Sequence, residues 1–291
     1  MRRAAMWTLA LIGLAASFEA ATAQRLMDAP VRVTAHPDAL VTGPAAIFWN
    51  PAGLGTGAYR TEVLVLNVRT PDVIGLAGFG GALAGKFERT TLAVGYEHVG
   101  IDDITETLNS PTDATGELSL GEDHFSIAAG RRVTRRVSVG AVARYARDNL
   151  GDTDPLLGLG AGVEFDAGGR FMPRFGAYAI SEKDIASWGA GVEARLPDFA
   201  GPDYRFGVSY GLGGRTDTFT AHRVLGFVDW GGTATLAAGM LSEPDASASN
   251  WQPVMAAGLR FRRYGIGVVR ESLANDFGAT YSFRLQVGFG K

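Results

Sequence analysis

The last residues of the chain alternate between large apolar side chains and small or polar ones. The apolar set is Tyr281, Phe283, Leu285, Val287 and Phe289, and the intervening set is Ser282, Arg284, Gln286 and Gly288. A period of two predicts a β-strand, because successive side chains of a strand point to opposite faces. One face is continuously apolar and the other carries Arg, Gln and Ser, which is typical of a strand between lipid and water.

About fourteen runs of this kind follow one another between residues 59 and 289. Several place apolar residues opposite glycine and scattered charge, as in 137–148, 156–166 and 187–196. Each run has roughly the 9 to 11 residues that a tilted strand needs to cross a membrane. Longer and shorter connections mostly alternate, as expected when both chain ends lie on one side of a barrel. The pattern predicts an all-β fold, an antiparallel transmembrane β-barrel of about fourteen strands over 58–291, with a water-filled interior.

A secreted β-sandwich is the alternative, since its strands also alternate. A sandwich buries its apolar faces in one core, whereas here an apolar, aromatic face recurs on nearly every run. Aromatic residues also stand near the ends of the runs, at Tyr145, Trp188, Tyr204 and Trp251 among others. Such positions are typical of the girdles at membrane interfaces, and they favour the membrane barrel.

The first 23 residues have the features of a secretory signal peptide. Arg2 and Arg3 precede an apolar run from Ala4 to Ala16, and the small residues of 21–23 form a cleavage signal. Thirteen residues are too few to span a bilayer of about 30 Å as a helix. We therefore expect removal of 1–23, export to the periplasm and residence in the bacterial outer membrane.

Composition excludes several classes of function. Without 1–23, which contain Arg2, Arg3 and Glu19, the chain has 268 residues with 25 basic and 29 acidic side chains. There is no basic patch for nucleic acid. The chain has no cysteine, which excludes disulfides, thiolate metal sites and a lipid-modified N-terminal cysteine. Its four histidines lack the spacing of metal ligands, so we expect no metal and no cofactor.

The most distinctive motif lies in 24–57, between the signal and the first strand. It comprises Phe48, Trp49, Asn50, Pro51, Ala52, Gly53 and Leu54. Asn-Pro followed by Ala-Gly favours a turn, because proline fixes its own φ angle and restricts the backbone of the residue before it. A compact, apolar segment ahead of a barrel suggests a plug or hatch, and a turn that only seals the barrel mouth is the alternative.

This motif, with Pro37-Asp38-Ala39-Leu40 before it, resembles the N-terminal region of the FadL superfamily of outer-membrane proteins. That superfamily includes transporters of fatty acids and aromatic hydrocarbons and the PorV/PorQ-like proteins of type IX secretion. The resemblance implies a fourteen-stranded barrel whose N-terminal segment folds into the lumen as a hatch. In this chain Val41-Thr42-Gly43-Pro44 separates the two parts of the motif, and 101–121 is the only long outer loop that the sequence predicts.

Seven charged residues fall on the predicted inner face of the strands. They are Arg144, Glu164, Glu193, Arg195, Arg205, Arg260 and Arg284. They could line a permeation path or pair across the interior, and pairing is favoured because buried charges need partners.

One further motif, Gly207-Val208-Ser209-Tyr210-Gly211, matches the pattern around the nucleophile of serine hydrolases. The chemistry needs a strand-to-helix elbow and a nearby histidine, for which only His222 and His124 are candidates. Because Ser209 lies within a predicted strand, we expect no catalytic residues and no enzyme, and a barrel-embedded lipase is the weakest alternative.

The function that these patterns favour is passive transport of small hydrophobic molecules across the outer membrane. A PorV-like structural or adaptor role in secretion is the main alternative. The expected partners are outer-membrane lipid and either hydrophobic solutes or a secreted protein, with no nucleic acid.

Overall fold

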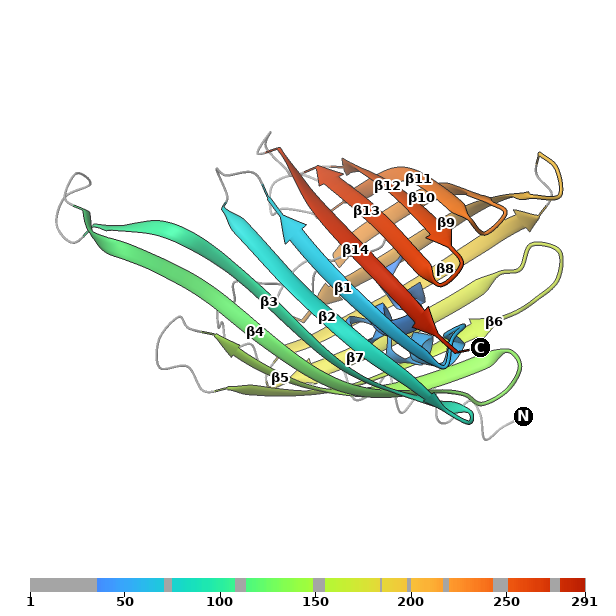
Figure 1. The fold of residues 1–291 in the computed structure, drawn as a ribbon, viewed down its shortest axis with the longest axis horizontal. Coiled ribbons are helices and arrows are strands. Elements are labelled where there is room, and N and C mark those ends of the chain that lie inside the picture. The colour runs from blue at the N-terminus through green and yellow to red at the C-terminus, as the bar shows by residue number, and fades with distance from the viewer. Residues whose placement is uncertain are drawn as a thin grey trace.

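Fourteen antiparallel strands form a closed barrel in the computed structural model (Figure 1). The structure describes residues 36–70, 75–107, 114–148, 155–183, 185–197, 200–216, 220–242, 251–272 and 278–290. The predicted signal peptide, 1–23, lies outside the described residues. The strands are β1 Thr61–Arg69, β2 Leu76–Phe87, β3 Thr90–Thr107, β4 Ala114–Arg132, β5 Val137–Asp148, β6 Leu156–Asp166, β7 Arg174–Glu182, β8 Ile185–Pro197, β9 Tyr204–Arg215, β10 Thr220–Trp230, β11 Ala234–Ser242, β12 Trp251–Phe261, β13 Tyr264–Ser272 and β14 Ala279–Phe289. The predicted fold class is confirmed.

The barrel closes where the first strand pairs with the last. All nine residues of β1 are in register with β14, from Thr61 opposite Phe289 to Arg69 opposite Tyr281. The same strand pairs on its other side with β2. Closure leaves no sheet edge, so every strand has hydrogen-bonding neighbours on both sides, as a membrane interior requires.

The outer surface of the barrel is apolar. Leu159, Leu236 and Ile266 are each at least 60% exposed although they lie within strands. Aromatic pairs occur near strand ends, including the stacked rings of Tyr204 and Trp230, whose centroids are 6.0 Å apart. Because the register keeps equivalent positions of neighbouring strands on one face, these side chains form a continuous band suited to lipid.

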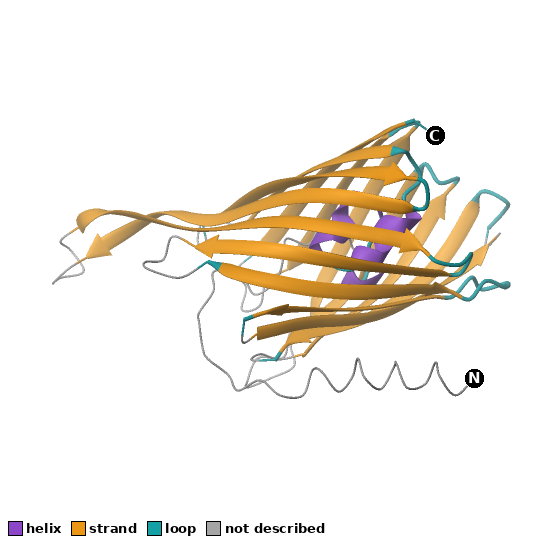
Figure 2. Cartoon of the chain, turned by 90° about the horizontal axis from the view of Figure 1, so that it is seen from below, coloured by secondary structure: helices purple, strands orange, loops and turns teal. Residues whose placement is uncertain are grey.

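A short irregular segment runs inside the barrel, as Figure 2 shows. It contains three 3-10 helices, η1 Asp38–Leu40, η2 Gly43–Phe48 and η3 Pro51–Thr56, and we call residues 36–57 the lumenal segment. It lies nearer the end of the barrel at which β14 finishes and which we call the hatch end (Figure 1). Among the described residues, no helix is long and apolar enough to cross a membrane.

The prediction of one long outer loop over 101–121 is wrong. β3 continues to Thr107 and β4 begins at Ala114, and the two pair beyond Ile101 with a register irregularity. They project past the other strands at the end opposite the hatch end (Figure 1). A long hairpin satisfies its own backbone groups in solvent, so the polar composition of this stretch did not prevent strand formation.

Two consecutive residues at the middle of β12 test the assignment of faces. Met255 is 54% exposed on the outer surface, whereas Ala256 lines an internal cavity. We expect Met255→Arg to lower the free energy of unfolding by about 2–4 kcal/mol, the cost of an arginine at the middle of the lipid layer. Ala256→Arg should cost less because its guanidinium reaches water in the cavity.

The measurement is urea unfolding in phospholipid vesicles, with both variants compared to the natural chain. Equal destabilisation by the two substitutions would contradict the assignment of the outer face to lipid.

Candidate functional site in the barrel lumen

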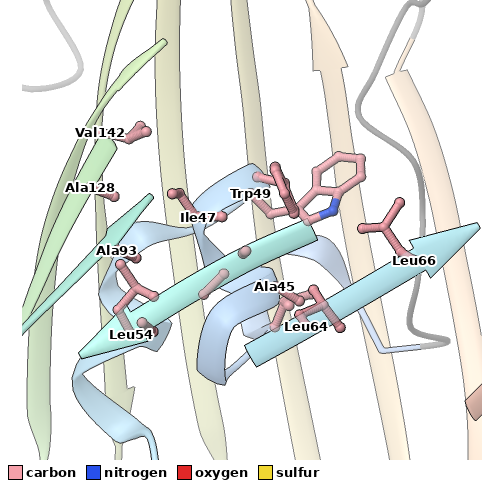
Figure 3. Packing of buried hydrophobic residues seen from close by; sticks show 14 of the residues in the cluster. Ala45, Ile47, Trp49, Leu54, Leu64, Leu66, Ala93, Ala128 and Val142 are labelled. Atoms are coloured by element: carbon pink, nitrogen blue, oxygen red, sulfur yellow. The ribbon is translucent and has the colours of Figure 1, made fainter. Parts of the chain in front are cut away.

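The lumenal segment fills one half of the barrel interior with an apolar core. Ile47, Phe48 and Leu54 are fully buried. They pack with inward-facing Leu64 and Leu66 of β1 and with small residues of β2 to β5. Figure 3 shows Ile47 and Leu54 beside Leu64 and the strand residues Ala93 and Ala128. The prediction of a water-filled interior is therefore wrong for this half, because the segment displaces the water and requires apolar partners.

Glycines on the inner wall make room for this close approach. A Cβ at Gly140 would lie 2.3 Å from the carbonyl carbon of Pro51, and one at Gly176 would lie 2.0 Å from the Ala39 oxygen. Both contacts are with backbone, which has little freedom to move. The inner-face glycines of β4 to β9 therefore form the surface on which the segment rests, in the way that glycine permits close approach of two chains.

Asn50 fixes the middle of the segment. It is completely buried, and its Nδ2 donates hydrogen bonds to the oxygens of Ala39 at 2.6 Å and Val163 at 3.2 Å. Its Oδ1 accepts a bond from the Ala52 N–H at 3.1 Å and so caps η3. One side chain thus joins η1, η3 and the wall strand β6.

Four of the seven predicted lumen charges lie beneath the segment and have partners. Arg144 donates to the Phe48 oxygen at 2.7 Å and lies 3.4 Å from Glu182. Glu164 lies 3.5 Å from Arg174. Glu193 accepts a hydrogen bond from Arg195 at 2.6 Å and lies 3.0 Å from His36. These groups tie the segment to β5 through β8.

The other three predicted lumen charges border a cavity of about 510 Å³ between the segment and the opposite wall, which Glu164 and Arg195 also line. Arg205, Arg260 and Arg284 come from β9, β12 and β14. Within the part of the chain that the structure describes, none of their side chains forms an ion pair or hydrogen bond. The structure therefore separates a paired set of lumen charges from an unpaired one.

Towards the other end of the barrel, this opposite wall is apolar on its inner face. Leu225, Leu241, Val254 and Val269 form a second buried cluster on β10 to β13. Arg223 lies at its border, and its Nη2 donates to Glu271 at 2.5 Å. The interior thus contains two buried apolar clusters, and the unpaired arginines among the described residues lie near the hatch end.

The serine motif does not form a hydrolase site. Ser209 is buried on the inner face of β9, and its hydroxyl has no hydrogen-bond partner among the described residues. His222 bonds instead to the hydroxyl of Tyr210, at 2.8 Å, and Tyr210 follows Ser209 and so points to the other face of the strand. His124 bonds to Glu122 at 2.6 Å. In the described part of the chain, no group of three acidic or histidine side chains is placed to hold a metal.

Sequence reasoning missed several residues that hold the segment. His36, Arg174 and Glu182 form its ion pairs, and Leu64 and Leu66 form its apolar floor. A signal for the floor was present, because 63–66 is apolar on both faces, whereas a wet lumen would require one polar face.

Comparison with known proteins identifies the fold. No family model and no curated protein matches the sequence. Among solved structures, the toluene transporter TbuX of Ralstonia pickettii superposes with a TM-score of 0.58 at 11% identity, covering 85% of this chain and 94% of that chain. The toluene transporter TodX of P. putida gives 0.55 at 10% identity, covering 86% and 95%. This similarity confirms the outer-membrane barrel fold that the resemblance to the FadL superfamily implied.

The first prediction from this site concerns Asn50. We expect Asn50→Ala to release the segment from β6 without opening the barrel, because each buried group left unpaired costs about 1–3 kcal/mol. Hydrogen exchange of the amides of 50–57 should then accelerate while that of the strands is unchanged. Asn67→Ala is the matched control, since the Asn67 side chain donates one hydrogen bond, to the Gly78 oxygen, and lies outside the segment. Unchanged exchange in Asn50→Ala would contradict the role of this side chain.

The second prediction concerns the glycine surface. In Gly140→Ala the new methyl group overlaps the Pro51 backbone. The urea midpoint of unfolding should therefore fall, and the amides of 50–57 should exchange their hydrogens faster. Gly258→Ala should have little effect, since its nearest contact is the Ile266 oxygen at 3.7 Å. Similar behaviour of the two variants would show that the wall does not support the segment.

Proposed function

We propose that this outer-membrane barrel passes small hydrophobic molecules passively, with the lumenal segment as its hatch. The observation that carries the proposal is that apolar side chains pack inside the barrel in two clusters. Leu64 and Leu66 pack with the segment in one cluster, and Leu225 and Val254 belong to the other. A barrel built for polar solutes has a polar lumen, whereas these walls favour contact with an apolar solute.

The similarity of fold supports the same proposal. TbuX and TodX are described as toluene transporters, and this chain shares their barrel architecture. Transport of this kind needs no covalent chemistry, only a path whose walls replace the water around the solute.

The attachment of the segment suggests how the path opens. Its helices contact β1 to β9, while the cavity separates it from the wall that contains β12 to β14. We infer that the solute passes on the cavity side, where a small shift of residues 48–54 widens the path. Short connections such as 88–89 and 262–263 lie at the end where β14 finishes, which supports a periplasmic position for the hatch end.

The test measures uptake by Gram-negative cells rather than by vesicles. Hydrophobic solutes cross a simple phospholipid bilayer unaided, whereas the outer leaflet of the outer membrane resists them. A Gram-negative strain lacking its own hydrocarbon channel would express the chain, and the initial rate of radiolabelled toluene uptake would be recorded. We expect a rate several times that of the empty vector and a further rise in Asn50→Ala, with Asn67→Ala equal to the natural chain. The amount of folded barrel in each strain is checked by the change in its gel mobility on heating. An uptake rate no higher than that of cells with the empty vector, although folded barrel is present, would refute the proposal.

The projecting strands β3 and β4 favour a second candidate, the adaptor role. They extend beyond the barrel on the side opposite the hatch end (Figure 1), where they offer a hairpin to a protein at the cell surface. Replacing 102–119 by a short turn separates the two functions. Loss of a co-purifying secreted protein with unchanged toluene uptake would support an adaptor role for the hairpin, and no co-purifying protein in either chain would exclude it.

A further inference from the structure

The cavity at the hatch end has an excess of positive charge from inward-facing strand residues. Arg205, Arg260 and Arg284 all border it, and Arg132 does so from the end of β4. Arg284 is partly buried, and the positive charge of Arg260 acts on it. Arginines outnumber carboxylates in the lining of the cavity, and an excess of cations in a confined space raises the local potential and attracts anions.

The carboxylates that line the same cavity are already engaged. Glu62 accepts hydrogen bonds from the N–H groups of Ala58 and Tyr59. Glu164 lies beside Arg174. Asp166 and Asp229 accept bonds from the backbone N–H groups of Gly168 and Gly232. The cavity therefore contains no acidic group committed to Arg205, Arg260 or Arg284 among the described residues.

A floor of glycine leaves room around the arginines. Gly265 and Gly267 of β13 lie between β12, which carries Arg260, and β14, which carries Arg284. A Cβ at Gly267 would lie 2.5 Å from Nε of Arg284, so the arginine side chain lies flat over this strand towards β12. Gly258 and Gly265 also line the cavity, and a Cβ at either position would make only ordinary contacts, of 3.7 Å or more. Both guanidinium groups are thus accessible from the same side.

From this arrangement we propose that the cavity beside the segment is a binding site for a small oxyanion, an organic molecule with a carboxylate or phosphate group. Arg260 and Arg284 bind the anionic group, since a guanidinium presents paired N–H donors that match two oxygens. Arg205, at the border of the cavity, adds a third positive charge that attracts the anion. A volume of about 510 Å³ lies within the range of about 300–1,000 Å³ that is typical of small-molecule sites, so the rest of the molecule fits beside Ala237 and Ala256.

The site binds whether or not the barrel passes hydrophobic solutes. Binding to purified protein and uptake of neutral toluene by cells are separate measurements, so failure of one proposal leaves the other standing.

Titration calorimetry on the purified barrel in non-ionic detergent tests the site, with benzoate and inorganic phosphate as probes and neutral benzamide as the uncharged match to benzoate. We expect benzoate to bind at least about tenfold more tightly than benzamide, because hydrogen bonds to a charged group are the stronger ones. Its affinity should fall as salt is raised.

The double variant Arg260→Gln/Arg284→Gln should weaken benzoate binding about tenfold or more and leave benzamide unchanged. Arg147→Gln, on an exposed position of β5, is the matched control and should bind benzoate as the natural chain does. Arg205→Gln provides a milder variant, with a smaller loss. Mobility of unheated samples on a denaturing gel shows which variants keep the closed barrel.

Equal affinity for benzoate and benzamide, with no binding of phosphate, would overturn the proposal. So would retention of benzoate affinity in a folded double variant.

Discussion

Closure of the sheet is the constraint on which the rest of the molecule depends. A strand surrounded by lipid has no water to satisfy its backbone groups, so both of its edges must be paired. Pairing of β1 with β14 meets this demand. It also fixes which residues face out and which face in, because a strand offers only two faces. The apolar band, the glycine surface beneath the segment and the arginines at the hatch end all follow from that assignment.

The interior shows how one barrel holds two environments. On the side of β1 to β9, the inserted segment contributes apolar side chains and backbone groups to the interior. The strands there contact it through glycines, leucines and paired charges. On the opposite side, no described segment packs on the wall near the hatch end, and unpaired arginines border the space between that wall and the segment. The proposed path for an apolar solute and the proposed oxyanion site therefore lie on the same side of the segment, in the space that the cavity forms.

The architecture could be predicted from the sequence because period-two alternation is a local signal repeated along the chain. The runs ending in Phe165 and Phe289 show it clearly, and the strand count is confirmed. The inside of the barrel was less predictable, because contacts such as Asn50 with Val163 join residues 113 positions apart. The alternating pattern placed Arg144 and Arg284 on the inner face of the barrel. Only the three-dimensional packing shows that Arg144 donates to the Phe48 oxygen, whereas the Arg284 side chain has no hydrogen-bond partner among the described residues. The hairpin of β3 and β4 was missed because its polar residues resemble those of a loop.

Enclosure of residues 36–57 has a consequence for biogenesis. The segment precedes β1 in the chain and rests mainly on the middle strands, so its binding surface exists only once those strands have formed a curved, still open sheet. A completed ring would have to admit it by threading through one mouth. Threading is avoided if the segment docks first and β1 then pairs with β14, so that closure of the barrel is the last step of assembly.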